Sequence, residues 1–562
     1  MQDPPTLPPY LPTIPNMLRH AAEHHGDREL MVCRSRRLTF AELAARSLEA
    51  ARGLVASGVT KGSHVGVLLP NGPEFAVTFM AAARIGAVVV PMSTLYQARE
   101  LEWVLRHADI DTLIVAPAYL RHDYLARLEQ ALPGLASHNG EPLFLTDAPH
   151  LRRIYVWADE APRWGHPAPA ALHSAAGHAG VSEALIHALE EAVTPADRAF
   201  MIYTSGSTAD PKGVVHTHGN SMRHSFQMST VYGLPAAGER VLSSRPFFWI
   251  AGLSATLFYA MHRGFCLVVP ADGDPTTYLE LMEAERADFV TGGAAAFAAI
   301  ANQAERSDHP LSVVQLVTDY AGVVTRSSSA RRFVCHRLEA LFPAEEAERT
   351  RHLMPGIYGM TETTSAYVSL PAPQRVPEHK AGANGKPAPG AFVRIVDPDT
   401  REPLPPDQPG ELLAGGYSLM AGLHKKERHE TFLGEVLYPT GDMCSVDEDG
   451  WVTFVTRLSE MIKISGANVA PLEVESLLNA REAIRESAVV GIEGNRRTEL
   501  VAAVILHDGA TIDEQQLIGE LKGELSSFKV PKRVVVLADA DVPRTATGKI
   551  HKPRLREHLA AG

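Results

Sequence analysis

The sequence contains few cysteines and lacks a long hydrophobic run. Four cysteines occur among 562 residues, and they show neither the C-x-x-C spacing of a zinc site nor the pattern of a disulfide framework. No segment approaches the roughly 18 continuous apolar residues of a membrane helix. Prolines near the start occupy the place where a signal peptide would carry a basic and then an apolar region. These absences predict a reduced, cytoplasmic protein without a transmembrane segment.

Positive charge is also scarce, because 53 lysines and arginines stand against 65 aspartates and glutamates. The formal net charge of −12 argues against a nucleic-acid-binding surface and against a polybasic membrane anchor. Among the 25 histidines the tightest pair is His216 and His218, and no third ligand follows at a suitable spacing. Core or solvated histidines are the better interpretation, so we predict no metal site made of histidine.

The length of the chain is too great for one hydrophobic core, so at least two domains are expected. Thr39 and Glu42 form a capping box that predicts the start of a helix ending at Gly58. Around it strands and helices alternate, which predicts parallel α/β sheets with helices on both faces. The expected strands are 64–69, 87–91, 112–116, 199–202, 240–244, 266–270, 289–291 and 313–319, and the expected helices include 17–25, 73–85 and 98–108.

Three later regions depart from this alternation. Residues 133–180 have no clear period, and we expect an irregular insert with a structural role there. From residue 390 onward, short strands separated by Pro/Gly/Asp turns predict a small β subdomain. The last hundred or so residues read as a compact α+β unit, enough for a separate domain. The predicted fold class is therefore α/β, with a large N-terminal domain over 1–456 and a small α+β C-terminal domain over 457–562.

A stretch of small and hydroxyl residues, TSGSTADPKG at 204–213, follows an apolar run that is typical of a buried strand. Small residues let backbone N–H groups approach phosphate oxygens, hydroxyls donate further hydrogen bonds, and Lys212 supplies a mobile positive charge. An ordinary surface turn has the same composition, so this stretch by itself leaves both interpretations open. Its spacing does not fit the G-x-x-x-x-G-K-[ST] pattern of a P-loop NTPase.

Four further motifs follow in order: YGMTET at 358–363, YPTGD at 438–442, RLSEMIK at 457–463 and PRTATGK at 543–549. In this order and at these separations, the five motifs resemble the adenylate-forming (ANL) superfamily. That superfamily includes acyl-CoA synthetases, adenylation domains of nonribosomal peptide synthetases and beetle luciferases. The resemblance covers residues 17 to 555, and five motifs in register are far more specific than any one of them.

The resemblance implies ATP-dependent activation of a carboxylic acid as an acyl adenylate, with release of pyrophosphate. It then implies thioester formation, in which the thiol of CoA displaces AMP after the mobile C-terminal domain has rotated. ATP, Mg²⁺, CoA and a carboxylic acid are the implied ligands, and a homodimer is a further option. Two alternatives stay open: transfer to carrier-protein pantetheine or to an amine, and a non-catalytic nucleotide-binding relative. Retention of Glu362 and Lys549 disfavours the non-catalytic alternative.

The same resemblance implies roles for individual residues. Lys549, Thr361 and Glu362 would be catalytic, with Glu362 as the Mg²⁺ ligand. Asp442 would accept hydrogen bonds from the ribose hydroxyls, and Arg457 would assist there. The hinge and the CoA side would involve Ser459 and Gly466. The other expected nucleotide-binding residues are Thr204, Ser205, Gly206, Ser207, Thr208, Lys212, Gly322, Val323, Tyr358, Gly359 and Met360.

The acid is expected to lie near PFFWIAG at 246–252. Amino-acid-activating members usually place an aspartate here, whereas this chain has Phe248 and Trp249. A free α-amino group would then be buried without a partner, so an acid with an uncharged body is favoured, whether fatty, aromatic or polycyclic. The candidate residues of the acyl pocket are Trp249, Gly252, Gly292, Val323 and Met360.

Four positions depart from the family pattern without removing a catalytic group, and one of them is Glu460, which stands where aspartate is common. Ala209 stands where the family usually has glycine, and Thr456 replaces the usual glycine before the hinge arginine. Ser459 occupies a place where lysine or aspartate is common. A residue other than glycine disfavours a positive φ, so the phosphate loop at Ala209 is expected to be set differently.

Overall fold

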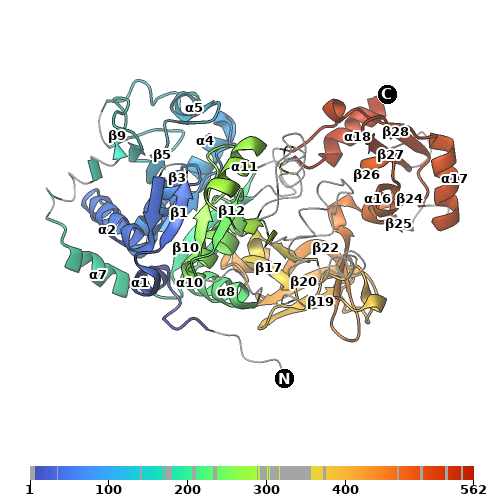
Figure 1. Cartoon of the computed structure of the whole chain (residues 1–562), viewed down its shortest axis with the longest axis horizontal. Helices are drawn as coiled ribbons and strands as arrows, with labels where there is room; N and C mark the ends of the chain where they lie inside the picture. Colours follow the sequence, from blue (N-terminus) through green and yellow to red (C-terminus); the bar gives the residue numbers. More distant parts are fainter. Residues whose placement is uncertain are drawn as a thin grey trace.

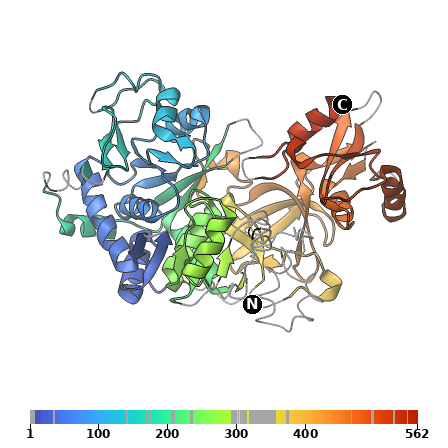
Figure 2. The same cartoon turned by 45° about the horizontal axis from the view of Figure 1, so that its top comes forward.

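Two large sheets, built from interleaved parts of the chain, are followed by a β subdomain and a C-terminal α+β unit (Figures 1 and 2). The blue and green N-terminal parts lie farthest from the red C-terminal unit, with the yellow and orange β subdomain between them. The structure is a computed structural model. It describes residues 7–33, 36–139, 142–168, 171–172, 177, 180–204, 210–231, 237–287, 289–291, 300, 303, 315–316, 356–370, 375–464, 467–493, 498–525, 529–545 and 548–561.

The first sheet has eight strands and is mostly parallel. Its central strands are apolar and buried, as expected for a sheet covered on both faces. The sheet is not wholly parallel, because β11 runs antiparallel to β10 and β21 runs antiparallel to β11. In spatial order the strands are β21 (Gly422–Leu423), β11 (Lys212–Thr217), β10 (Arg198–Thr204), β4 (Val88–Pro91), β3 (His64–Leu68), β5 (Thr112–Val115), β8 (Arg153–Val156) and β9 (His166–Pro167).

The second sheet combines an N-terminal hairpin with strands from the middle of the chain. Val32 pairs in parallel with Val268, so two segments that are far apart in the sequence become neighbours. In spatial order its strands are β15 (Gln315–Leu316), β14 (Phe289–Thr291), β12 (Arg240–Ser243), β13 (Cys266–Val268), β1 (Glu29–Cys33) and β2 (Arg36–Thr39).

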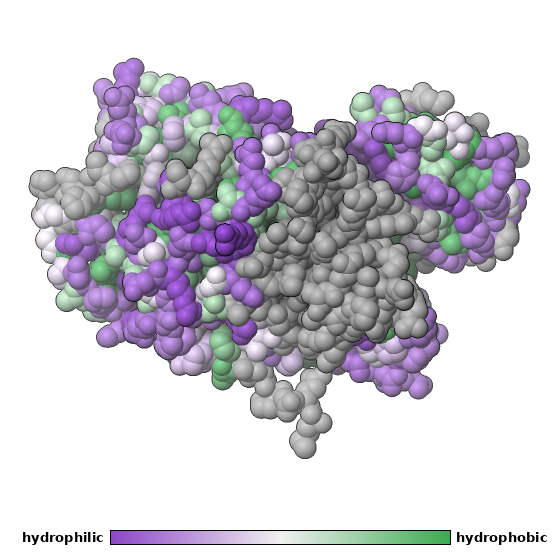
Figure 3. Space-filling model, in the orientation of Figure 1, coloured by the Kyte–Doolittle hydropathy of each residue, from purple (hydrophilic) through white to green (hydrophobic). Residues whose placement is uncertain are grey.

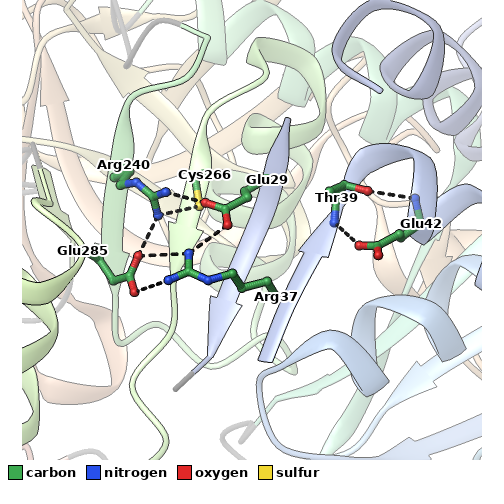
Figure 4. Close-up of polar contacts among 7 residues, drawn as sticks. All are labelled: Glu29, Arg37, Thr39, Glu42, Arg240, Cys266 and Glu285. Carbon is green, nitrogen blue, oxygen red and sulfur yellow. Dashed lines mark hydrogen bonds and ion pairs between the residues drawn. The ribbon is translucent and has the colours of Figure 1, made fainter. Parts of the chain in front are cut away.

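A network of four charges ties that hairpin to the rest of the second sheet (Figure 4). Arg37 contacts Glu29 and Glu285 at 2.8 Å each, and Arg240 contacts Glu285 at 2.9 Å and also pairs with Glu29. Each carboxylate therefore lies between both guanidinium groups, an arrangement in which networked ion pairs contribute more than isolated surface pairs. Glu285 directly follows α11 (Pro275–Ala284), so the network joins β1, β2 and β12 to the end of this helix.

Helices pack on the sheets as the alternation predicted. The capping box is confirmed, because Thr39 accepts from the Glu42 backbone and Glu42 accepts from the Thr39 backbone at the start of α2 (Figure 4). Where α2, α3 and α7 pack together, Arg84 and Glu190 form a buried ion pair, and Arg84 also donates to Ser47. The main helices of this part are α1 (Ile14–His25), α2 (Phe40–Ala56), α3 (Pro73–Arg84), α4 (Ala98–His107), α7 (Glu183–Glu191), α8 (His218–Val231) and α10 (Tyr259–Arg263).

The β subdomain and the C-terminal α+β unit are confirmed. The subdomain has a four-stranded antiparallel sheet of β19 (Ala391–Val396), β20 (Gly410–Gly416), β22 (Tyr438–Val446) and β23 (Val452–Arg457), and a three-stranded sheet of β16 (Tyr358–Met360), β17 (Ser365–Ser369) and β18 (Lys386–Pro387). The C-terminal unit contains β24 (Ile462–Ile464), β25 (Ala467–Val469), α16 (Pro471–Asn479), β26 (Ile484–Glu493), β27 (Thr498–Leu506), α17 (Glu514–Glu524), β28 (Arg533–Val536) and α18 (Lys552–Ala561). This unit has an apolar core of its own, which includes Val474, Val489 and Leu521.

Two sequence-based expectations need correction. The region 133–180 is not only an irregular insert, because its strand β8 pairs in parallel with β5 and extends the first sheet. Strand β22 was not expected at all, since Pro439 and Gly441 lie within it and both residues weaken strand signals. Both strands are identified by their pairing partners rather than by their own sequence.

The described surface carries no large contiguous apolar region on the face shown in Figure 3, where hydrophobic residues are scattered among hydrophilic ones. The exposed large apolar residues belong to separate elements and loops, among them Leu120, Phe144, Leu185, Phe392 and Val436. None of the helices formed by the described residues is both long enough and apolar enough to span a bilayer.

Candidate active site

Lys212, Glu362 and Tyr438 form a polar cluster between the first sheet and the β subdomain. The ammonium of Lys212 lies 2.5 Å from Oε1 of Glu362 and donates to the Tyr438 hydroxyl at 3.2 Å. Tyr438 in turn donates to Glu362 at 3.1 Å. Burial and the Glu362 charge raise the pKa of Tyr438 far above its ordinary value, so this hydroxyl remains a donor. The cluster gives a buried carboxylate one cationic and one neutral partner.

A second cluster surrounds Asp442, which is only 3% exposed. Tyr358 donates a hydrogen bond to Oδ2 of Asp442 at 2.9 Å, and Nε of Arg457 lies 3.5 Å from Oδ1. Asp442 and Arg457 face each other across the pair β22–β23. Burial raises the pKa of Asp442 above its ordinary value, although the Arg457 charge and the Tyr358 hydrogen bond oppose this shift.

The two clusters are joined through the backbone that carries them. Tyr438 and Asp442 lie four residues apart on β22, while Tyr358 and Glu362 lie four residues apart on the facing segment. Tyr438 contacts Glu362 and Tyr358 contacts Asp442, so the two segments run side by side in opposite directions. The structure therefore brings together Lys212, Glu362, Tyr358, Asp442 and Arg457, which the sequence placed in one site.

The short helical turn η3 (Thr361–Thr363) carries Glu362, and hydrogen bonds with neighbouring segments hold it in place. The backbone of Met420 donates to the Glu362 carbonyl oxygen at 2.8 Å. Thr364, with φ of 60°, donates to the Ser418 carbonyl oxygen at 2.6 Å and lies 3.2 Å from Nδ1 of His216. Asn220 of α8 reaches the same region and donates to the Leu419 carbonyl oxygen at 2.8 Å.

The two histidines considered for metal binding are core residues. His216 and His218 are fully buried, and burial lowers the pKa of each to about 3, so both rings are neutral. Over the part of the chain that the structure describes, no three histidine, cysteine, aspartate or glutamate side chains gather in a group that could hold a metal ion. Buried Cys33, Cys266 and Cys444 are free thiols.

Thr204 ends β10 directly opposite Lys212 on β11. Its hydroxyl oxygen is buried and has no hydrogen-bond partner among the described residues. The pair therefore presents an unused hydroxyl and an ammonium at the point where the predicted phosphate loop begins and ends. The predicted site residues outside the described part of the chain are Ser205, Gly206, Ser207, Thr208, Gly292, Gly322, Val323 and Gly466.

The candidate acyl-pocket residues are partly explained by packing. Trp249 is half-buried before α9 (Ile250–Gly252), with its ring edge-on to Phe248 at 5.4 Å. A Cβ atom at Gly252 would lie 1.9 Å from the Pro246 carbonyl oxygen, so close backbone approach accounts for this glycine without a pocket. A π-helical turn, η1 (Leu253–Phe258), follows, and such turns are frequent at functional sites.

Sequence reasoning assigned no role to Asn71, although its side chain fixes the segment before Trp249. Asn71 donates to the Arg245 carbonyl oxygen at 2.8 Å and accepts from the Phe247 backbone at 2.8 Å. Tyr438 lies in the YPTGD motif, but its sequence position likewise predicted no role for it. That motif was the available signal for Tyr438, whereas the contacts of Asn71 become visible only in the structure.

Lys549 lies in a different environment from Lys212. It follows Gly548, whose φ is 81°, in an exposed turn closed by a hydrogen bond from the Thr545 backbone to the Lys549 carbonyl oxygen at 2.7 Å. Its side chain makes no hydrogen bond or ion pair with any residue that the structure describes. Nearby, Lys552 contacts Glu460 at 3.1 Å and Glu475 at 2.9 Å, linking α18 to the helical turn η5 (Leu458–Glu460), where Ser459 lies.

Comparison with known proteins identifies the class. The AMP-binding enzyme family matches residues 18–424, and the AMP-binding enzyme C-terminal domain matches residues 473–549. The chain therefore belongs to the AMP-binding enzymes, which confirms the predicted relation to the adenylate-forming superfamily. The predicted reaction class, acid adenylation followed by thioester formation, is confirmed with it.

Individual relatives sharpen this assignment. The chain is 30% identical to a feruloyl-CoA synthase from Amycolatopsis sp, over 93% of this chain and 94% of that protein. It is 27% identical to the mitochondrial medium-chain acyl-CoA ligase ACSF2 from Rattus norvegicus, over 97% of this chain and 87% of that protein. The fold matches ATP-bound MatB from Rhodopseudomonas palustris with a TM-score of 0.75 at 24% identity, covering 97% of this chain and 99% of that one. The predicted α/β fold with a smaller C-terminal unit is thereby confirmed.

Proposed function

We propose that this protein joins a carboxylic acid to CoA at the site built around Lys212, Glu362 and Asp442. A carboxylate oxygen of the acid attacks the α-phosphorus of ATP, and the bond to pyrophosphate breaks. The CoA sulfur then attacks the acyl carbon, the bond to AMP breaks, and the thiol proton passes to solvent. The observation that carries the proposal is the meeting of Lys212 with Glu362, because it unites two motifs 150 positions apart at one point.

Lys212 and Thr204 are the proposed phosphate ligands on the β10–β11 side. Lys212 supplies a positive charge, and the unpartnered Thr204 hydroxyl supplies a hydrogen bond. Thr361 begins the facing turn and is proposed to contact the α-phosphate. In this arrangement the phosphates lie between Lys212 and Glu362. Lys212 then contacts a negatively charged phosphate in place of the Glu362 carboxylate, and Glu362 contacts a cation in place of the Lys212 ammonium.

Glu362 is the proposed protein ligand of Mg²⁺. A single buried carboxylate fits this ion, which usually binds one or two carboxylates together with substrate phosphates and waters. When bound, Mg²⁺ neutralises negative charge on the phosphate oxygens. Tyr438 donates to the same carboxylate and orients it toward the phosphate side.

Asp442 is the proposed ribose ligand. Its two oxygens can accept two hydroxyl hydrogen bonds, and Tyr358 and Arg457 hold the carboxylate in place. The ring of Tyr358 stacks with Phe454 at 6.2 Å, which presents a rigid aromatic surface for the adenine. Gly359 has no room for a Cβ atom, because one would lie 2.0 Å from the Ser365 carbonyl oxygen.

The proposed domain boundary follows residue 456, so that Arg457, Leu458 and Ser459 form the hinge. Strand β23 ends at Arg457 and the helical turn η5 begins at Leu458, so the backbone changes from extended to helical at this position. Rotation about the hinge would bring Lys549 to the α-phosphate for adenylation and remove it for thioester formation. The side chain of Lys549 is free to serve in this way because no described residue binds it.

The proposed substrate is an acid with an uncharged body. Phe248 and Trp249 offer apolar and aromatic surface and no carboxylate at the place where amino-acid-activating members pair the substrate ammonium. Met360 is the other described candidate for the pocket wall. The reduced thiols suit a cytoplasmic location, which we also propose.

Pyrophosphate release across a panel of fatty, aryl and hydroxycinnamic acids, each with and without CoA, tests the function. At least one acid is expected to release pyrophosphate, and CoA is expected to convert it to the thioester, as detected by mass spectrometry. The contrary result is that CoA leaves the product as free acyl-AMP and that a thioester forms only with carrier-protein pantetheine. That result would assign the protein to the enzymes that transfer the acyl group to a carrier protein.

A further inference from the structure

Helix α4 contacts both chain segments that flank residues 205–209. Near its C-terminal end, Nδ1 of His107 lies 2.6 Å from the Tyr203 hydroxyl. One turn earlier, Nε1 of Trp103 donates to the Pro211 carbonyl oxygen at 3.1 Å. Tyr203 directly precedes Thr204, and Pro211 directly precedes Lys212. Two side chains of one helix therefore bind the hairpin β10–β11 beside both proposed phosphate ligands.

The two α4 side chains form one rigid unit. Their rings stack with centroids 4.9 Å apart and planes at 22°. The His107 ring also meets the Tyr203 ring edge-on at 5.7 Å. Because stacked rings restrict each other's rotamers, the two hydrogen bonds are held at a constant separation along the helix.

The hairpin is also held along its β11 edge. The backbone of His424, just after β21, donates to the Gly213 carbonyl oxygen at 2.8 Å, and its ring lies edge-on to His107 at 5.4 Å. Gly213 is packed so tightly that a Cβ atom would lie 2.6 Å from the Met201 sulfur and 3.1 Å from Cζ of Tyr203. Tyr203 therefore has little room to move while it keeps its hydrogen bond to His107.

The protonation states of His107 and Tyr203 allow the hydrogen bond between these two side chains. Burial lowers the pKa of His107, so the ring is neutral at pH 7 and its Nδ1 can accept a proton donor. Burial also raises the pKa of Tyr203 well above its ordinary value, so the hydroxyl keeps its proton and donates.

We propose that Trp103 and His107 are positioning residues for the phosphates of ATP. They act through the backbone beside Thr204 and Lys212, which face each other across β10 and β11. The inference rests on the proposed function and extends it to two side chains that themselves touch no substrate. A small displacement of the hairpin would move the Lys212 ammonium away from its place opposite Glu362.

The experiment compares two tyrosines that each lose one buried hydroxyl. Tyr203→Phe removes the hydroxyl beside His107, and Tyr155→Phe removes a hydroxyl that donates to Ser57 over the same distance of 2.6 Å. Tyr155 lies in β8, four strands from β10 in the same sheet. The second variant therefore measures the general cost of such a loss at a place remote from the hairpin.

Tyr203→Phe and His107→Phe are each expected to raise the Kd of ATP, measured by calorimetry without acid, by about three- to tenfold. The KM of the acid should not change. The double variant should bind ATP no more weakly than either single variant, because both substitutions remove the same hydrogen bond. Trp103→Phe, which keeps a ring but removes the N–H donor, should also weaken ATP binding.

Tyr155→Phe should lower Tm to a similar extent and leave the Kd of ATP unchanged. The inference is overturned if Tyr203→Phe binds ATP as well as Tyr155→Phe does, or if the two substitutions in the double variant act additively. Failure of the proposed function is a separate result, since wild-type protein would then release no pyrophosphate with any acid. The order of ATP affinities among the variants would still test the positioning role.

Discussion

Two lysines of the proposed site differ in what surrounds them. Lys212 lies beside the Glu362 carboxylate and the Tyr438 hydroxyl, and each of these three side chains contacts the other two. Lys549 lies in an exposed turn of the C-terminal unit, and no described side chain binds it. We expect Lys212 to keep its place in both half-reactions, whereas Lys549, which no described residue binds, can enter and leave the site without breaking contacts among the described residues. The difference predicts that one lysine serves the whole cycle and the other serves one step.

The largest expected effect separates the two half-reactions. Lys549→Ala should reduce acid-dependent pyrophosphate release by about 10²–10³-fold, because a positive charge at the α-phosphate is lost in the transition state. Transfer to CoA from a pre-made acyl-AMP should remain close to the wild-type rate. Single-turnover measurements of each half-reaction provide the test. Equal losses of rate in both half-reactions would contradict the assigned role of Lys549. Lys549 and Lys212 would then not differ in the step that they serve.

The paired lysine should behave differently. Lys212→Met should suppress pyrophosphate release and also lower stability by about 1–3 kcal/mol, because the buried Glu362 carboxylate loses its cation. The double variant Lys212→Met/Glu362→Gln should recover much of that stability, measured by urea denaturation, without recovering activity.

Glu362→Gln by itself should raise the Mg²⁺ concentration needed for half-maximal rate. An unchanged Mg²⁺ requirement would remove Glu362 from the metal site.

Asp442 should show a conflict between stability and ATP binding. Burial raises its pKa in the folded protein, so its contribution to stability is present below the ordinary carboxyl pKa and is lost as pH rises through the raised value. Asp442→Asn should therefore be at least as stable as wild type at pH 7, and this advantage should disappear in acid. Its ATP affinity should fall about ten- to a hundredfold, because hydrogen bonds to a charged acceptor are lost.

The same carboxylate predicts the direction of a pH profile. ATP binding needs ionised Asp442, so affinity should decline as pH falls through the raised pKa. Arg457→Ala removes a charge that opposes this shift, and the decline should then begin at a higher pH. Calorimetric titration with ATP, at pH values from about 4.5 to 8, measures this decline in wild type and in Arg457→Ala. A decline at the wild-type pH in Arg457→Ala would mean that Arg457 does not act on Asp442.

The smallest effect concerns the acid. Trp249→Asp should not improve the kcat/KM of fatty or aromatic acids, since a carboxylate in an apolar surrounding has no partner on the uncharged body of such an acid. Trp249→Phe is the matched control that keeps an aromatic ring. A gain with amino acids in Trp249→Asp would support the place assigned to Trp249, and a gain with fatty acids would contradict it.

Sequence reasoning succeeded where a local pattern determines the structure. The capping box at Thr39 and Glu42 and the apolar strands β3 to β5 follow from local patterns, for which a short-range rule is sufficient. The shared site of Lys212 and Glu362 was expected from the family resemblance, because the stretch at 204–213 by itself is also compatible with a surface turn.

Sequence reasoning missed features that depend on distant partners. Strand β8 is recognisable only beside β5, and the close approach of Pro246 gives Gly252 a packing role that its sequence position does not indicate. Trp103 and His107 look like ordinary helix residues until Pro211 and Tyr203 lie against them. No spacing in the sequence reports such contacts, because packing between separate elements creates them.

The hairpin β1–β2 has a consequence for synthesis of the chain. Its apolar strand Glu29–Cys33 pairs with residues that are made about 240 positions later, Val32 against Val268. At a translation rate of about 5–20 residues per second, the strand waits roughly 10–50 s for its neighbour. During that time an open strand edge is available to other chains, so early chaperone contact or a slow release from the ribosome should raise the yield of native enzyme.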